Sequence, residues 1–419
     1  MSREYFRRNF VFLTLDGLLF FLGMVFVSYE SVMPVFLARL GGSKTAIAMV
    51  PVAVALGLNL PSILAARRIE AMDRKIPYIR LVGMMQRFPY PVVAVVILLL
   101  ATSSPSWVVV AVLAGIAAST ACAGLIIPAF FDVVATTIPV EYRGRLFAMR
   151  SVLSYLFGIG GGLLVRYVLD AVAFPGNYAL LYGLASLVLY LGWVAFLFVK
   201  EPRVAPVREP AVERGPVLRE AMVLLRSNRS FTLYIVSRAF LIVSFAGTAF
   251  FPVYLVETHG LPDSITGVFA LITAATFVVV NPALGWLADR KGYKPVFIVS
   301  FISLGTASLL GAANLATPGA FVLIVLTALS QSVNMFAFNM TVEFAPPGQV
   351  PTYIGVSGLI IGLAALLALL VGQLVDRFGY AAVFWVTGVT AVLGLLVMQF
   401  GVEEPRVAQR RLNQPDTPI

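Results

Sequence analysis

Several ionisable side chains stand inside long apolar stretches of this sequence, where charge is costly. They are Asp16, Glu30, Arg87, Asp132, Arg238 and Glu343. An ionised group in the middle of a membrane-spanning helix costs about 2.5–3.5 kcal/mol on insertion scales, so a charge kept there usually has a function. For a carboxylate near an arginine, the chemistry on offer is the binding and release of a proton.

Asp16, Arg87 and Arg238 lie at similar depths, about 10 to 15 Å from the start of their apolar stretches at the rise of a helix. Burial disfavours a charged carboxylate and a nearby arginine favours it, so a rearrangement can switch its proton. We predict Asp16 as the proton-responsive group, with Arg238 or Arg87 as its counter-charge. A static ion pair that fixes helix packing is the alternative. Glu30, near the outer end of its stretch, either joins this set or is simply hydrated.

Polar side chains also mark the apolar stretch 319–343 as a candidate binding surface. Gln331, Asn334 and Asn339 stand there among Phe338 and other large apolar side chains. Amides donate and accept hydrogen bonds and aromatic surfaces adapt to varied ligands, so we predict a substrate wall; hydrogen bonding between helices is the alternative. Further lining is predicted from three aromatic residues, Tyr29, Tyr155 and Phe250. The scarcity of polar groups favours a small amphipathic compound over a sugar, and the arginines leave an organic anion open.

Other chemistry finds little support in the sequence. One cysteine, Cys122, and one histidine, His259, are too few for an intramolecular disulfide or a Cys- or His-ligated metal site. No apolar stretch offers a nucleophile with its base or a paired acid and base, and no Walker-type phosphate-binding loop is present. We therefore expect no enzyme, no catalytic residues, no bound metal and no cofactor.

The elements that carry these residues must be membrane helices. Hydrophobic residues make up 60% of the 419 positions and charged residues 12%, whereas a soluble protein has about a quarter charged. Stretches of about 20 or more apolar residues recur, each long enough to cross a bilayer as a helix. We predict an all-α membrane protein with twelve spans, at 10–37, 44–66, 77–101, 106–136, 146–169, 177–199, 231–256, 264–288, 294–314, 319–343, 352–375 and 380–401.

The net charge of +10 is explained by how the basic residues are distributed along the chain, which indicates the orientation in the membrane. Most of the lysines and arginines, Arg150 among them, fall on cytoplasmic segments if the N-terminus is inside, as cytoplasmic loops require. This placement predicts a protein of the cell (inner or plasma) membrane with both termini cytoplasmic. It also predicts that the lipid bilayer, rather than a nucleic acid, is the partner of the basic surface.

The two halves of the sequence resemble each other. Pro34 and Pro252 stand in similar strings, and the string EPRVA occurs at 201–205 and again at 404–408. A duplication of six helices explains this best. We expect bundles at 1–200 and 231–405, a linker at 201–230 and a tail at 406–419. From Pro216 the linker has the pattern of a short amphipathic helix, either on the inner leaflet or in solvent.

Residues 285–294, GWLADRKGYK, lie between the eighth and ninth spans. This segment resembles motif A of the major facilitator superfamily, and the chain is similar to a bacterial-type twelve-helix member. The resemblance implies two six-helix bundles and alternating access. The counterpart in the first half has Arg68 at the position of the motif's Asp, and residues 157–162 lack the proline of the antiporter signature. Both departures argue against a standard drug/proton antiporter.

Motif A is predicted to form a cytoplasmic gate. Gly285 and Gly292 permit close packing and a tight turn, Asp289 can accept hydrogen bonds from a helix N-terminus, and Arg290 can pair with Glu343. The matching place in the first half is taken by Asp132, with Arg143 and Arg145 nearby. A proton-carrying role or simple hydration is the alternative for these charges.

Together these patterns predict a secondary transporter that works by alternating access. We expect proton coupling and export of a small amphipathic or hydrophobic compound. The alternatives are an uptake symporter or facilitator for an organic anion or nutrient, and a non-transporting sensor or lipid-handling protein. The expected partners are a small-molecule substrate, protons and the bilayer, and the expected oligomeric state is a monomer.

Overall fold

The computed structural model describes residues 5–70, 72–201, 217–313, 317–346 and 350–407. Every regular element in these residues is a helix, as the apolar composition predicts. A helix pairs its backbone N–H and C=O groups within one segment, and this is required in a membrane because lipid tails offer no hydrogen-bond partners. The chain divides into two compact units, each described here by itself: unit 1 is Met1–Glu209 with Ala249–Ala275, and unit 2 is Pro210–Thr248 with Thr276–Ile419.

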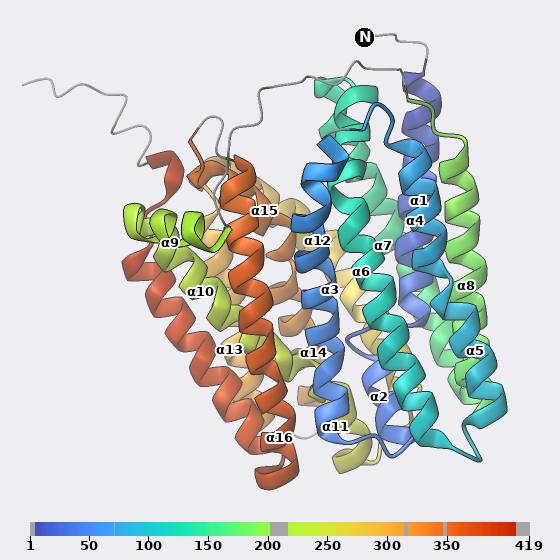
Figure 1. Ribbon diagram of the computed structural model, residues 1–419. Coiled ribbons are helices and arrows are strands. Elements are labelled where there is room, and N and C mark those ends of the chain that lie inside the picture. Colours follow the sequence, from blue (N-terminus) through green and yellow to red (C-terminus); the bar gives the residue numbers. More distant parts are fainter. Residues whose placement is uncertain (1–4, 71, 202–216, 314–316, 347–349, 408–419) are drawn as a thin grey trace, which may run out of the picture. The chain divides into compact units, whose positions relative to one another are not determined.

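Unit 1 holds most of the first sequence half (Figure 1). Its helices are α1 (Phe6–Phe26), α2 (Val32–Arg39), α3 (Lys44–Glu70), α4 (Ile76–Arg87), α5 (Pro89–Leu100), α6 (Pro105–Thr137), α7 (Val140–Ala171), α8 (Gly176–Leu197), α11 (Phe250–His259) and the first part of α12 (Ile265–Lys291). Helix α1 packs on α7 and α8, and α3 packs on α6. A Cβ at Gly124 would overlap the Gly57 carbonyl, so the two glycines let α3 and α6 meet closely.

Unit 2 holds the rest of the described chain. Its helices are α9 (Val217–Ser227), α10 (Arg229–Phe245), the 3₁₀ turn η1 (Ala246–Ala249, shared with unit 1), the second part of α12, α13 (Lys294–Ala312), α14 (Thr317–Gln331), α15 (Asn334–Phe344), α16 (Val350–Leu396) and the π-helical turn η2 (Val397–Gly401). Its core lies where α10 and α13 pack on α16. Helix α9, predicted from the linker pattern, runs crosswise to α10 (Figure 1).

Eleven helical segments in the described residues are long and apolar enough to cross a membrane. The last of them, Thr352–Val407, has 56 residues, and α16 within it breaks at Gly379, where φ is 78° and ψ 179°. At 1.5 Å per residue, a helix of that length would be more than twice as long as the roughly 30 Å of hydrocarbon. This segment therefore accounts for two crossings, in agreement with the twelve predicted spans.

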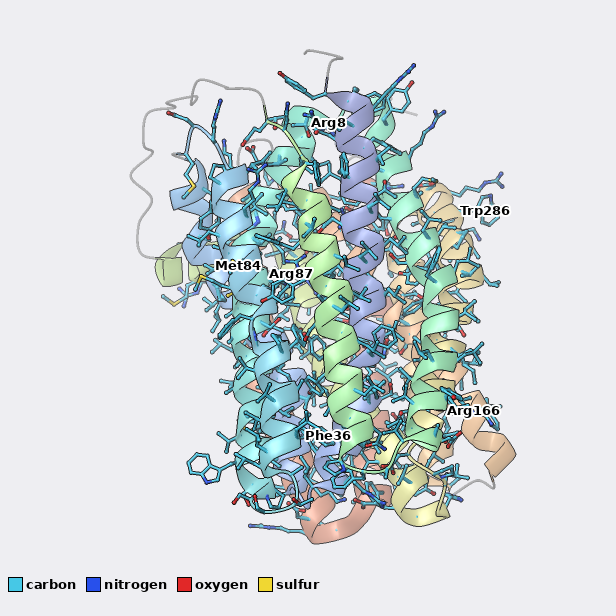
Figure 2. The ribbon with its side chains drawn as sticks, turned by 90° about the vertical axis from the view of Figure 1, so that its right-hand side faces the viewer. Arg8, Phe36, Met84, Arg87, Arg166 and Trp286 are labelled. Atoms are coloured by element: carbon cyan, nitrogen blue, oxygen red, sulfur yellow. The ribbon has the colours of Figure 1, made fainter. Side chains whose placement is uncertain are left out.

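The side chains fit lipid as the solvent. Large apolar residues on the helix surfaces are exposed, among them Leu99, Trp107 and Phe400, which a soluble protein rarely tolerates over so many positions. Figure 2 shows Arg8 at one end of unit 1 and Arg166 toward the other, with Arg87 between them among the helices. The described structure thus carries the multi-pass membrane fold that the composition requires.

The compact units differ from the sequence halves at one place. The segment Ala249–Ala275 comes from the second half but belongs to unit 1, and its boundary falls at the turn η1. Span one is broken at the corresponding place, between α1 and α2. A broken membrane helix leaves backbone groups that must be satisfied by protein or water, so such breaks usually border a cavity or a moving part.

Candidate functional site: a buried charge cluster

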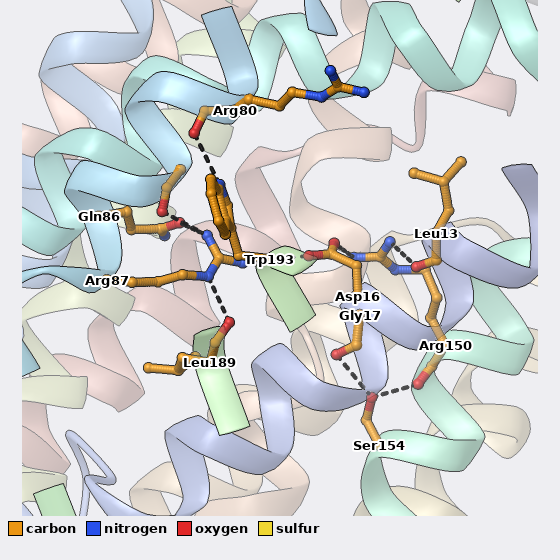
Figure 3. Close-up of polar contacts among 11 residues, drawn as sticks. Leu13, Asp16, Gly17, Arg80, Gln86, Arg87, Arg150, Ser154, Leu189 and Trp193 are labelled. Carbon is orange, nitrogen blue, oxygen red and sulfur yellow. Dashed lines mark hydrogen bonds and ion pairs between the residues drawn. The ribbon is translucent and has the colours of Figure 1, made fainter. Parts of the chain in front are cut away.

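Asp16 lies on α1 and is 8% exposed. Its Oδ1 is 3.3 Å from Nη2 of Arg87, and its Oδ2 is 3.7 Å from Nη2 of Arg150 (Figure 3). The structure thus pairs Asp16 with Arg87, one of its two predicted counter-charges, and adds a second arginine from α7. The other predicted counter-charge, Arg238 on α10 of unit 2, donates from Nη1 to Oγ of Ser357, 3.1 Å away.

Arg87 is held by acceptors on every side. Its Nε donates to the Leu189 carbonyl at 2.8 Å, and its Nη1 donates to the Gly83 carbonyl at 2.8 Å and to Gln86 Oε1 at 3.2 Å. Its Nη2 donates to Asp16. Figure 3 shows Gln86 from α4, Leu189 from α8 and Asp16 from α1 around this guanidinium. Because all three nitrogens have acceptors, the position of this guanidinium does not depend on Asp16 alone.

Arg150 is held more loosely. Its Nη1 donates to the Leu13 carbonyl at 2.6 Å, and its guanidinium lies over the ring of Phe130, 4.8 Å from the centroid. Oγ of Ser154, one turn along α7, donates to the Arg150 carbonyl. A Cβ at Gly17 would overlap the guanidinium, so the glycine next to Asp16 leaves room for Arg150 to reach α1.

Sequence reasoning missed Arg150 because it counted this residue with the cytoplasmic charges, although it lies near the start of the span predicted at 146–169. In the structure Arg150 lies inside a helical segment, Tyr142–Ala171, that is long enough to span the membrane. Two sequence signals could have found it: an arginine beyond the start of an apolar run, and a glycine directly after the buried Asp16.

The cluster carries more positive than negative charge. In the described residues, the charged group that acts on Arg150 is Asp16, and Arg87 feels Asp16 together with the phenols of Tyr90 and Tyr190. Two guanidinium groups and one carboxylate leave a formal charge of +1. A buried ion pair normally balances its charges, because an uncompensated charge is expensive away from water.

A chain of hydroxyl groups lies next to the cluster in unit 1. Tyr29 and Tyr90 have their hydroxyl oxygens 3.1 Å apart, and Tyr90 and Ser119 theirs 3.0 Å apart. Tyr29, predicted to line a cavity, is therefore part of a hydrogen-bonded network that is partly buried at Tyr29 and buried at Tyr90 and Ser119. Of the other predicted lining residues in this unit, Phe250 is fully buried on α11 and Tyr155 is partly buried on α7.

The remaining predicted residues differ in exposure. Glu30 is exposed, in line with the hydrated alternative. In unit 2, Asn334, Phe338 and Asn339 are exposed on α15, whereas Gln331 is 8% exposed at the end of α14. The amides on α15 are therefore accessible, whereas Gln331 is not.

The charged residues predicted to form a gate in unit 2 include Glu343, which the structure pairs with Arg406. This arginine donates from Nε to Glu343 Oε1 at 2.7 Å and from Nη1 to the Ala288 carbonyl at 2.9 Å. It also lies over the ring of Tyr293, whose pKa is raised by burial and by the Glu343 carboxylate. The partner predicted for Glu343 was Arg290, which instead lies over the ring of Trp286, 4.4 Å from the centroid. Residues four apart share a helix face, which explains this stacking.

Gly292 and Glu404 form the turn of motif A. Glu404 Oε2 accepts a hydrogen bond from the backbone N–H of Lys294 at 2.8 Å, at the start of α13. Gly292 has φ of 84°, and a Cβ there would overlap the Glu404 carboxylate. The acidic residue at this helix N-terminus is therefore Glu404. Asp289, which was predicted for this role, has an exposed side chain, and its backbone carbonyl accepts a hydrogen bond from Arg406 at 3.3 Å. At Gly285, predicted to permit close packing, a Cβ would meet open space among the described residues.

The first half repeats this arrangement with different residues. Glu201 Oε2 accepts from the backbone N–H groups of Lys75 and Ile76, at 2.8 and 3.0 Å, at the start of α4. Glu201 and Glu404 open the two EPRVA strings, so the repeat places a carboxylate at the same helix end in each half. Lys75 Nζ lies 3.0 Å from Asp132 Oδ2, an ion pair outside hydrogen-bond geometry.

The two arginines predicted near Asp132 have other contacts in the structure. Arg143 donates from Nη2 to the Ala135 carbonyl at 2.6 Å and from Nε to the Ile138 carbonyl at 3.1 Å, at the C-terminal end of α6. Arg145 lies over the ring of Tyr142. Positive charge at a helix C-terminus is favourable, so Arg143 stabilises the end of α6.

A third set of polar contacts joins the starts of α3 and α8 to the segment Ala249–Ala275 within unit 1. Lys44 pairs with Glu257 at 2.5 Å, and Tyr178 donates its hydroxyl to Asp263 Oδ2 at 3.0 Å. Nearby, a Cβ at Gly162 would lie 2.6 Å from the Leu271 backbone nitrogen, so α7 and α12 touch at backbone distance. Segments from the two sequence halves therefore meet at this end of unit 1.

The family-model comparison matches the description Major Facilitator Superfamily over residues 84–326 and 264–418. The chain belongs to the major facilitator superfamily. Solved structures of the same fold include a D-xylose–proton symporter, with 15% identity, 96% of this chain and 99% of that chain covered, and a TM-score of 0.74. A POT family transporter in complex with a thioalcohol-conjugated peptide has 13% identity, 97% of each chain covered, and a TM-score of 0.72.

The nucleoside transporter NupG has 13% identity, 94% of this chain and 100% of that chain covered, and a TM-score of 0.71. As a member of the major facilitator superfamily, the chain is a transporter and not an enzyme. Within this superfamily member, the structure brings Asp16 and Arg87 together and ties Glu343 to motif A through Arg406. The Lys44 and Asp263 contacts were not foreseen from the sequence.

Proposed function

We propose that this superfamily member is a secondary transporter that works by alternating access, is coupled to protons, and moves a small amphipathic compound. The observation that carries the proposal is the buried Asp16 carboxylate, held between two arginines that are anchored to different degrees. A carboxylate in this position is a group whose protonation changes what its neighbours can bind.

Protonation of Asp16 would act mainly on Arg150. Arg87 keeps the carbonyls of Leu189 and Gly83 whatever the state of Asp16, whereas Arg150 keeps, among the described residues, the Leu13 carbonyl alone. Because Arg150 lies on α7 and Asp16 on α1, the proton would weaken the contact between these two helices. Coupling of a proton to helix movement is what a proton-driven carrier requires.

Alternating access requires contacts that break in turn at the two ends of the molecule. At one end of unit 1, the Lys44–Glu257 pair and the Tyr178–Asp263 hydrogen bond join segments of both sequence halves, and we assign them to the outer gate. In unit 2, we assign the Glu343–Arg406 pair at motif A to the cytoplasmic gate. A proton symporter of D-xylose with the same fold supports proton coupling in this architecture.

The direction of transport has two candidates. The apolar composition of the sequence favours an amphipathic or hydrophobic compound, and the first candidate is its export. The surplus of buried arginine over carboxylate favours the second candidate, uptake or facilitated entry of an organic anion. Asp16 serves as the proton group in both, so one variant tests the coupling for either direction.

The test is transport by the full-length protein in proteoliposomes with an imposed pH gradient. Compounds that raise its melting temperature would be supplied one at a time. We expect the wild type to accumulate such a compound against its gradient, and Asp16→Asn to exchange it across the membrane without accumulation. Glu30→Gln, which changes an exposed acidic residue in the turn between α1 and α2, is the matched control and should accumulate normally. Accumulation by Asp16→Asn driven by the pH gradient would refute the proposal.

A further inference from the structure

We propose that Arg150 binds the substrate, and that the substrate is an amphipathic organic anion with a carboxylate or similar oxyanion beside an apolar body. The inference rests on the proposed function, because it assigns a substrate class to the site that contains Asp16. It begins from the difference between the two arginines of the charge cluster.

The first step is a count of hydrogen bonds. Arg87 uses all three guanidinium nitrogens, but in the residues that the structure describes Arg150 makes one side-chain hydrogen bond, from Nη1 to Leu13. Its Nη2 is 3.7 Å from Asp16, beyond hydrogen-bond distance. Its side chain is 12% exposed, against 6% for Arg87. Arg150 therefore has the donors and the access that a bidentate oxyanion needs, and Arg87 does not.

The second step is the charge balance. The charged and titratable groups that face the cluster are Asp16 from α1, Arg87 from α4, Tyr90 from α5, Arg150 from α7 and Tyr190 from α8. With neutral phenols their formal sum is +1, and a proton on Asp16 makes it +2. A monovalent anion on Arg150 restores neutrality in the first state and halves the charge in the second.

The third step is the surface next to the guanidinium. Arg150 lies over the ring of Phe130, whose centroid is 6.0 Å from that of Phe131, and Phe131 in turn lies near Phe147. Phe131 is 44% exposed. An anion held by Arg150 would therefore place the rest of its body against aromatic surface, which favours an apolar or aromatic group over a hydroxylated one.

The geometry also fixes the sign of the coupling. Asp16 and the bound anion share Arg150, so removing the charge of Asp16 by protonation strengthens anion binding. The proton and the anion are then carried in the same half of the cycle. This is the mode of a symporter, so among the two directional candidates the inference selects uptake of an organic anion with a proton.

The test uses purified full-length protein and matched pairs of small molecules. Benzoate and octanoate are the anionic probes, and benzamide and octanamide are their neutral counterparts. Binding would be measured by calorimetry near pH 5.5 and near pH 7.5, where simple carboxylic acids, with pKa values of roughly 4–5, are mostly ionised. We expect the carboxylates to bind, more tightly at the lower pH, and the amides to bind at least about 10-fold more weakly.

Three variants complete the design. Arg150→Gln should weaken carboxylate binding at least about 10-fold, and Arg150→Lys should recover part of it because the charge remains. Arg166→Gln, which changes an exposed arginine further along α7, is the matched control and should bind like the wild type. Asp16→Asn should bind carboxylates equally well at both pH values, with the affinity that the wild type has at the lower pH. This result would also show that the binding site of the variant is folded.

The outcomes separate the inference from the proposed function. Amides that bind as well as carboxylates, or an Arg150→Gln protein that binds as the wild type does, would overturn the anion site and leave the role of Asp16 intact. A second outcome concerns Asp16. If carboxylates bind through Arg150 but their affinity does not change with pH in the wild type or in Asp16→Asn, the coupling is overturned, and with it the proposed proton group.

Discussion

Gly292 offers the sharpest test of how motif A is built, because two independent features oppose a side chain there. Its φ of 84° is unfavourable for any residue with a Cβ, by roughly 1–2 kcal/mol. A Cβ would also displace the Glu404 carboxylate, which accepts the N–H of Lys294 at the start of α13. Loss of such a capping contact costs about 0.5–2 kcal/mol. The two terms predict that Gly292→Ala destabilises unit 2 by about 1.5–4 kcal/mol.

The assay is thermal unfolding of the purified protein in detergent. For a folding unit of this size each kcal/mol lowers the melting temperature by about 2–4 °C, so Gly292→Ala should lower it on the order of 5–15 °C. Gly285→Ala is the matched control in the same motif. Among the described residues a Cβ at Gly285 meets open space, so its effect should stay within about 0.5 kcal/mol.

A double-mutant cycle separates the two terms. In a Glu404→Ala background the carboxylate is absent, so Gly292→Ala should cost only the backbone term of roughly 1–2 kcal/mol, and the two changes should be less than additive. A Gly292→Ala protein as stable as Gly285→Ala would refute the reasoning. Strict additivity in the cycle would refute the role of Glu404 in particular.

Three further predictions follow from contacts in the structure. Glu201→Gln keeps an acceptor at the start of α4 but removes its charge, and should lower the free energy of unfolding by about 0.5–1 kcal/mol in a thermal scan. Glu343→Gln weakens the bond to Arg406 and should slow substrate exchange in proteoliposomes without changing which compounds compete; altered selectivity would contradict a gate role. Gly162→Leu cannot fit against the Leu271 backbone and should lower the free energy of unfolding by about 1–3 kcal/mol, whereas an unchanged melting temperature would show that the two helices part freely.

The sequence was a good guide to the spans because hydrophobic length is a local property. Twelve crossings and their helical nature follow from runs of apolar residues, and motif A predicts the turn at Gly292. Arg87 could be named as one of two candidate partners of Asp16 from their similar depth in the membrane. Depth limits the choice of partners to a few, but it does not say which helices lie next to each other.

Partners set by tertiary packing could not be foreseen. Arg150 reaches Asp16 only because α7 packs on α1 and Gly17 leaves space, and neither fact is local to Arg150. Arg406 takes Glu343 because the chain after η2 returns to motif A. In the same way the EPRVA repeat could be recognised in the sequence, but its capping role could not. That role depends on the sixth span of each half ending beside the start of the third span of the same half.

The caps at Glu201 and Glu404 bear on how the chain can be cut or extended. The second EPRVA string lies only a few residues past the last membrane crossing, where a sequence-based design would place a truncation or a fused tag. A break before residue 404 would remove the cap of α13 and the arginine that holds Glu343, although no membrane span would be touched. The functional end of the second bundle therefore lies at least as far as Arg406, beyond the last residue that lipid requires.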